Sequence, residues 1–175
     1  MSALKSPQDS HSVPAATPTQ TMVFRSSEYY FGAPLSDVEE ILTPMPLTPI
    51  PHSESYVIGM GYRGRFVFPV IDYYALIMGA DPLPQRDSSV YLLFRTKSGW
   101  TAVSVDSLVK IQSIPLNSAR LQSVDKIGAF AAQFNLGSEF AASIIDVGAI
   151  EGRPLPVLNF PVLLEQSLWA KKRVA

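Results

Sequence analysis

Three aspartates are the side chains of this 175-residue chain best placed for chemistry, because each follows or lies within a β-prone apolar run. They are Asp72, Asp106 and Asp146. A carboxylate in an apolar setting can act as a general acid or base, which would suit a small enzyme or a ligand-binding β-barrel using Asp72 or Asp106. No histidine, nucleophile or second acid lies near Asp106 in the sequence, so the competing interpretation is that Asp106 caps a turn through Ser107-Leu108.

Other groups that commonly carry chemistry are scarce. His11 lies in a polar N-terminal segment, and His52 is the one other histidine. The chain has no cysteine, which excludes disulfides, thiol catalysis and thiolate metal sites. Motifs for phosphate loops, dinucleotides, zinc proteolysis and α/β-hydrolases are absent. The sequence therefore predicts no catalytic residue, no metal site and no cofactor.

Composition and charge narrow the class of partner. Apolar residues make up 47% of the chain, which predicts a packed core. The formal net charge is −1, which argues against nucleic acid as the main partner because phosphate neutralisation needs clustered cations. No apolar run reaches the ~20 residues that span a bilayer, so direct membrane insertion is not expected. The lack of cysteine is compatible with a cytoplasmic location.

The stretch from Tyr56 to Gly79 predicts the unit around which the fold is organised. Runs 56–60 and 66–71 favour strands, and the glycines between them permit a turn, so a β-hairpin is expected. Asp72 then suits the N-cap of a short helix over 73–78, and Gly79 suits its C-terminal end.

The segments before this unit are expected to be a tail, a hairpin and a stiff loop. Residues 1–20 are polar and predict a disordered tail, and runs 21–24 and 28–33 predict a first hairpin. Residues 36–42 begin with a Ser-x-x-Glu pattern and fit a helical turn with a capping box. Four prolines between residues 43 and 51 predict an extended crossover, with its apolar side chains packed on the fold.

The second half predicts further short strands. Runs 90–94 and 100–105 read as a hairpin, the Ile114-Pro115 pair predicts a strand break, and 116–125 predicts a surface loop. Residues 127–134 fit either a strand or a helix, and 141–147 fits a strand followed by a turn at 148–152. The prolines around 155–159 predict an edge strand.

Several of these pieces, in this order, resemble the CheW family of adaptors that couple chemoreceptors to a histidine kinase. The matching residues are Val38, Glu40, Ile41, Leu47–Pro51, Gly59, Pro69–Asp72, Val105 and Asp106. The resemblance covers roughly residues 22–165. It implies a short strand within residues 36–42, as the alternative to a helical turn, and a pairing of Glu40 with an arginine of the hairpin. The Arg63-Gly64 pair lies one residue earlier than the family spacing, so either Arg63 or Arg65 is expected to take that role.

The resemblance implies an all-β fold of two small five-stranded SH3-like barrels in one domain, residues 21–165. The first barrel is expected at about 21–79 and the second at about 83–159, with a last helical turn at 161–169 and a C-terminal tail at 166–175. It implies a non-catalytic adaptor for chemotaxis or type IV pilus motility. The implied partners are the regulatory domain of a CheA-type kinase and the cytoplasmic tip of a chemoreceptor. The implied partner-binding residues are Val38, Glu40, Ile41, Arg63, Gly64, Arg65, Val105 and Asp106.

Overall fold

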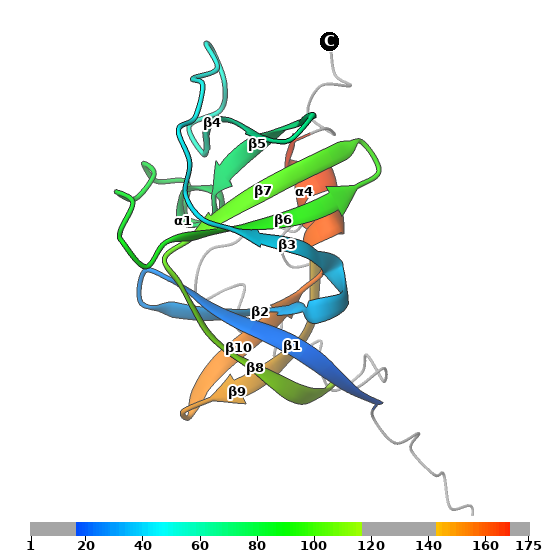
Figure 1. Ribbon diagram of the computed structural model, residues 1–175. Coiled ribbons are helices and arrows are strands. Elements are labelled where there is room, and N and C mark those ends of the chain that lie inside the picture. The colour runs from blue at the N-terminus through cyan, green and yellow to red at the C-terminus, as the bar shows by residue number, and fades with distance from the viewer. Residues whose placement is uncertain (1–16, 117–142, 169–175) are drawn as a thin grey trace, which may run out of the picture.

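Two five-stranded sheets make up most of the protein (Figure 1). The computed structural model describes residues 17–116 and 143–168. Its elements are β1 (Thr17–Ser26), β2 (Tyr29–Pro34), the 3₁₀ helix η1 (Leu35–Asp37), β3 (Val38–Leu42), β4 (Val57–Arg63), β5 (Phe66–Asp72), α1 (Tyr73–Met78), β6 (Val90–Thr96), β7 (Gly99–Val105), β8 (Ser107–Leu116), β9 (Ile144–Ile150), β10 (Arg153–Leu158) and α4 (Phe160–Leu168). The segments expected at 116–125 and 127–134 lie outside the described residues, apart from Leu116.

The strand order confirms the expected all-β class and corrects the expected division of the chain. Sheet A has the order β8-β1-β2-β10-β9, and sheet B has the order β3-β6-β7-β5-β4. Each sheet therefore takes strands from both halves of the chain, so a division near residues 79–83 does not hold. Strands from the two halves mix in this way because β2 pairs with β10 and β3 pairs with β6. The chain then passes from sheet B to sheet A between β7 and β8.

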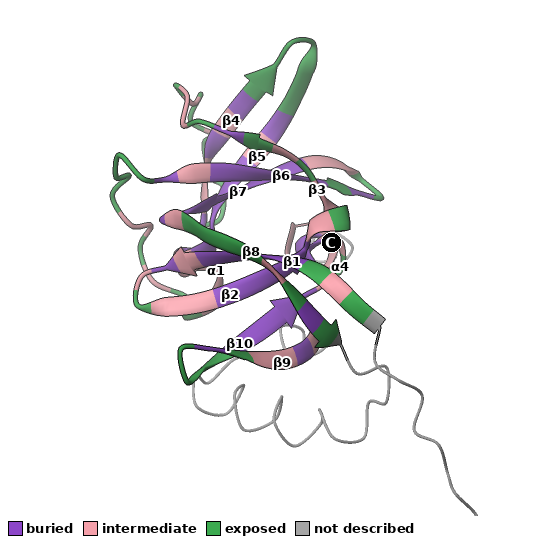
Figure 2. Cartoon of the chain, turned by 60° about the horizontal axis from the view of Figure 1, so that its bottom comes forward, coloured by how far each residue is buried: buried purple, intermediate pink, exposed green. Residues whose placement is uncertain are grey.

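Alternation along the strands builds three apolar clusters. Successive side chains of a strand point to opposite faces, so one strand can serve two cores. In β6, Leu92 and Phe94 join the large cluster between the sheets, whereas Tyr91 and Leu93 join the inner cluster of sheet B. In sheet A a third cluster gathers around Val23, Leu155 and Val157. Figure 2 shows the buried strands of both sheets with exposed ends and turns.

The central hairpin and helix form as the sequence predicted. β4 and β5 pair antiparallel, and Asp72 Oδ1 accepts a hydrogen bond from the Ala75 N–H at 2.8 Å. Gly79 ends α1 with φ 62°, and Gly64 opens the β4–β5 turn with φ 58°. Both glycines lie in the left-handed region where other residues are disfavoured.

For residues 36–42 the structure decides between a helical turn and a strand. Residues 35–37 form a 3₁₀ turn without a side-chain cap, and Val38–Leu42 is a strand. The proline-rich crossover packs as expected: Met45 and Leu47 contact the inner cluster of sheet B, and Thr48 bridges to Met60 of β4.

Two expectations about prolines were wrong. β8 continues through Pro115. An edge strand tolerates a proline, and among the residues that the structure describes one side of β8 pairs with no other strand. β10, predicted as an edge strand, lies between β2 and β9. It meets β2 in one parallel bridge, between Val157 and Gly32, so the missing N–H groups of its prolines interrupt little of that ladder.

The ends of the fold extend beyond the expected boundaries. β1 begins at Thr17, four residues before the expected start of the domain at residue 21, and residues 17–20 pair with the end of β8. α4 runs to Leu168, so the expected last helix forms and continues past residue 165.

Candidate protein-interaction site

An ion pair joins the two edge strands of sheet B. Arg63 of β4 places Nη2 at 2.9 Å and Nε at 3.1 Å from Glu40 Oε1 of β3. In a flat five-stranded sheet the edges would lie four strand spacings apart, roughly 19 Å, which is too far for these side chains. Sheet B must therefore curl until its edges approach. The structure also selects Arg63 rather than Arg65 as the partner of Glu40.

The curled end of sheet B opens into a hollow of about 300 Å³, called here the mouth. Its lining comes from all five strands and the β4–β5 turn: Glu40, Arg63, Gly64, Phe66, Leu93 and Trp100. Phe66 and Trp100 continue the inner face that carries Phe68 and Ala102 deeper in the sheet. The mouth is thus the open end of an apolar core, rimmed by one ion pair.

Two arginines and two aromatic rings form a row along the mouth, named here the Arg–aromatic row. The rings of Phe66 and Trp100 lie 5.8 Å apart. Arg65 stacks on Phe66 with its guanidinium carbon 5.7 Å from the ring centre, and Arg95 stacks on Trp100 at 5.6 Å. These distances are within the range of cation–π attraction.

Strand register explains why these residues meet. Arg95 is the direct antiparallel partner of Trp100, and Arg63 is the partner of Phe66, so each pair shares one face of the sheet. Arg95, Leu93 and Trp100 were not among the site residues predicted from the sequence. The β6–β7 hairpin held the signal for Arg95 and Trp100, because a two-residue turn at Lys97-Ser98 sets them opposite each other.

Two implied site residues of β3 lie outside the mouth. Ile41 is 44% exposed and follows Glu40 in the strand, so it points to the opposite face. Val38 is half-buried and packs against the cluster between the sheets. Glu40, Arg63 and Gly64 are the implied site residues that the structure brings together, with Arg65 beside them.

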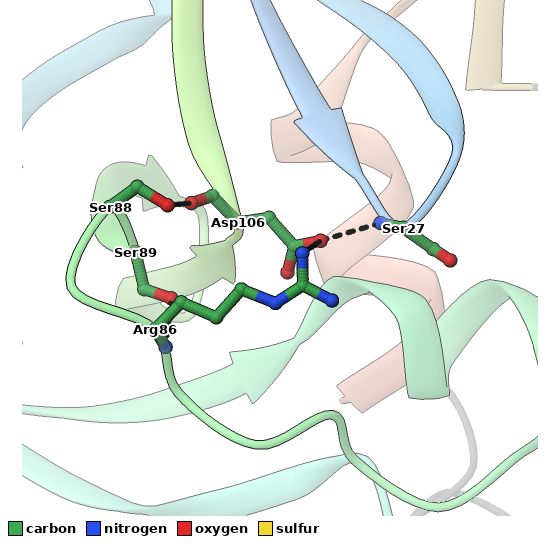
Figure 3. A network of polar contacts seen from close by, with 5 residues as sticks. All are labelled: Ser27, Arg86, Ser88, Ser89 and Asp106. Atoms are coloured by element: carbon green, nitrogen blue, oxygen red, sulfur yellow. Dashed lines mark hydrogen bonds and ion pairs between the residues drawn. The ribbon is translucent and has the colours of Figure 1, made fainter.

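Val105 and Asp106 are buried at the crossing from sheet B to sheet A. Val105 is 2% exposed and belongs to the cluster between the sheets. Asp106 Oδ2 accepts a hydrogen bond from the N–H of Ser27 at 2.8 Å (Figure 3). The Asp106 N–H donates to the carbonyl of Arg25 at 2.9 Å. These bonds tie the β1–β2 turn to the crossing, and no partner could reach Val105 without opening the core.

Polar groups of the segment before β6 complete the surroundings of Asp106. The Ser88 hydroxyl donates to the Asp106 carbonyl at 2.8 Å, and Arg86 Nη1 lies 4.0 Å from Oδ2 (Figure 3). The expectation that Asp106 caps a turn through residues 107–108 was wrong in its position. The carboxylate caps the turn at Ser27, on a different strand pair.

The other two aspartates also serve the backbone. Asp72 caps α1, and burial raises the pKa of its carboxyl above the ordinary value, with a smaller contribution from Asp106. Asp146 Oδ1 accepts a hydrogen bond from the N–H of Val147 at 2.8 Å. Within residues 17–116 and 143–168, no three acidic, histidine or cysteine side chains gather as a metal site would require.

A second hollow, of about 450 Å³, lies between the proline-rich crossover and the end of α4. Ile50, His52, Glu54 and Tyr56 line it, together with Leu168 of α4. None of the three aspartates reaches it. In the described part of the chain, the three aspartates singled out from the sequence and this hollow are therefore in different places.

Comparison with known proteins defines the class. A model of the CheW-like domain matches residues 20–160, and the chain belongs to this family. Among solved structures, the chain is similar to the scaffolding protein TtCheW from Thermoanaerobacter tengcongensis, with a TM-score of 0.66 and 17% sequence identity. The alignment covers 85% of this chain and 94% of TtCheW. No curated protein matches in sequence. In the described part of the chain, no helix is long and apolar enough to cross a membrane.

Proposed function

We propose that this protein is a non-catalytic adaptor that couples the cytoplasmic tip of a chemoreceptor to the regulatory domain of a CheA-type histidine kinase. Such coupling takes place in the cytoplasm and serves either chemotaxis or type IV pilus motility. The observation that carries the proposal is the match to the CheW-like domain over residues 20–160, supported by the likeness to a scaffolding protein, TtCheW.

The surface of sheet B supports a role in binding two partners. The mouth presents Phe66, 46% exposed, beside the Glu40–Arg63 pair. On the outer face, Ile41, Tyr62 and Val67 are exposed apolar side chains, at 44%, 65% and 63%. Apolar centres with polar rims are typical of protein interfaces, and signalling contacts can be small. Two faces of one sheet would allow two partners to bind together.

A three-component binding experiment tests the proposal. Purified protein is mixed with the kinase regulatory domain and a receptor fragment from the same organism, singly and together. We expect weak binding in each pair and tighter binding when all three assemble, because multivalency raises the effective concentration. Binding to neither partner would contradict the proposal.

The Ile41→Glu variant makes the same experiment specific to one face. Ile41 is exposed, so a charge there should spare the fold and remove one partner. A matched Glu39→Lys change on the same strand controls for altered charge. Loss of both partners together with loss of cooperative unfolding would show damage to the fold instead.

A further inference from the structure

We propose that the mouth of sheet B takes a protein segment that presents one apolar side chain between two carboxylates. The inference deepens the adaptor function and rests on it, because it names the chemistry that one partner must offer. It assigns recognition to the Arg–aromatic row: Arg65, Phe66, Trp100 and Arg95.

The apolar part of the recognition follows from the lining of the mouth. Phe66, Leu93 and Trp100 face the hollow, and Phe66 is 46% exposed although it is a large aromatic side chain. About 300 Å³ is at the lower limit of sites for small molecules, and the mouth is open to solvent. The space suits one inserted side chain. Burying it would cover apolar surface that the folded chain leaves in water.

The acidic part of the recognition follows from the two flanking arginines. Arg63 is neutralised by Glu40, whereas Arg65 and Arg95 have no ion pair among the residues that the structure describes. The chain as a whole carries a net charge of −1. Arg65 and Arg95, without an ion pair in the described part of the chain, therefore give the surface beside the mouth a local excess of positive charge. A carboxylate can bind a guanidinium through two parallel hydrogen bonds, which makes it the matching group on a partner.

Stacking on the rings orders both arginine side chains before a partner binds. Each guanidinium lies over a ring at 5.6–5.7 Å, and the two rings contact each other at 5.8 Å. A stacked guanidinium keeps its N–H edges free for hydrogen bonds. Side chains that are already ordered lose less entropy on binding, which is why Trp and Arg at the centre of a patch often dominate affinity.

Binding measurements with the protein partners test the inference against the adaptor function. The variants are Arg65→Gln and Arg95→Gln, and the matched control is Arg153→Gln, because Arg153 stacks on Tyr30 at 6.0 Å in sheet A, away from the mouth. We expect each mouth variant to weaken binding of one partner by roughly threefold, as for a partly exposed charge pair, and to reduce its salt dependence. Arg153→Gln should leave both unchanged. If the native protein binds its partners and the mouth variants bind equally well, the inference fails and the adaptor function stands.

A peptide titration tests the mouth without either partner. The probes are the capped tripeptides Asp-Leu-Asp, Ser-Leu-Ser and Lys-Leu-Lys, followed through the indole N–H signal of Trp100 in NMR spectra, with Trp100→Phe to assign it. We expect the acidic peptide to shift this signal at lower concentration than the neutral one, and the basic peptide to have no effect. An equal response to the acidic and basic peptides, or no response to the acidic one, would overturn the inference even if no protein partner binds.

Discussion

The Glu40–Arg63 ion pair is exposed, and this exposure limits what it contributes to stability. The Arg63 side chain is 62% exposed and that of Glu40 is 38% exposed. Pairs of this kind are worth about 0–1 kcal/mol, because water screens the charges and ordering two long side chains costs entropy. The main role of the pair is therefore to hold the Arg63 guanidinium at the rim of the mouth and to keep the two edge strands of sheet B together.

A double-mutant cycle measures this pair directly. We expect Glu40→Ala and Arg63→Ala to show a coupling of about 0.3–1 kcal/mol in the free energy of unfolding, and Glu40→Ala with Arg65→Ala to show less than about 0.3 kcal/mol. Urea titrations of the four proteins in each cycle give the values. Stronger coupling to Arg65 than to Arg63 would contradict the geometry of the site.

Asp72 should make stability depend on pH. Burial raises the pKa of its carboxyl in the folded chain, so the folded state holds the proton more tightly than the unfolded state. The contribution of this group is therefore fully present below the unfolded value, about 4, and is lost as pH rises through the raised folded value. Asp72→Asn keeps an oxygen acceptor for the Ala75 N–H and removes the titration.

We therefore expect the stability of Asp72→Asn relative to the native protein to increase as pH rises through this window. Urea unfolding at a series of pH values measures the difference. A difference that stays constant with pH, or one that falls, would show that the carboxyl is not raised in the folded state.

At the scale of elements, the β4–β5 hairpin depends on two glycines for different reasons. Gly64 has φ 58°, and a Cβ there would meet nothing within 4 Å. Gly61 lies in β4, where a Cβ would come within 2.9 Å of the Phe68 ring. A larger residue at position 64 is disfavoured by the backbone conformation, whereas one at position 61 is disfavoured by lack of space.

Alanine and asparagine substitutions separate these causes. We expect Gly64→Ala to cost about 1 kcal/mol and Gly64→Asn less, because asparagine tolerates the left-handed region. Gly61→Ala should cost about 1–3 kcal/mol through overpacking. Chemical denaturation measures all three, and a neutral Gly64→Ala would mean that the turn is not formed as described.

The start of β1 makes a second element-scale prediction. Thr17–Gln20 pairs with residues 113–116 of β8, so this part of the N-terminal segment belongs to sheet A. Deletion of residues 1–16 should change the thermal midpoint little, whereas deletion of residues 1–20 should lower it, because four ladder positions are lost. Differential scanning calorimetry of the two truncated proteins measures this, and equal midpoints would place the boundary where the sequence first suggested it.

For the whole molecule, Asp106 is the residue that joins the sheets at their crossing. It is 6% exposed, and it binds the N–H of Ser27 and the carbonyl of Arg25. Removing the carboxylate leaves the Ser27 N–H without that acceptor. We expect Asp106→Ala to cost about 1–3 kcal/mol in the free energy of unfolding and Asp106→Asn less, since the amide oxygen can still accept. A change below about 0.5 kcal/mol in both would show that the turn does not depend on this bond.

Local patterns in the sequence were sufficient to predict much of the secondary structure. The hairpin of β4 and β5, the cap at Asp72 and the helix end at Gly79 depend on neighbouring residues, so alternation, capping and turn chemistry predicted them. The order of several short motifs also pointed to the CheW family, which the match over residues 20–160 confirmed.

Contacts between distant segments were decided by the tertiary structure alone. The exchange of strands between the sheets joins residues such as Gly32 and Val157, and no local pattern encodes that pairing. The choice of Arg63 over Arg65 depended on how the two edges of sheet B approach, and the mouth depended on all five strands of that sheet. A strand's alternation fixes which side chains share a face, but the face on which two strands meet is set by packing of the whole chain.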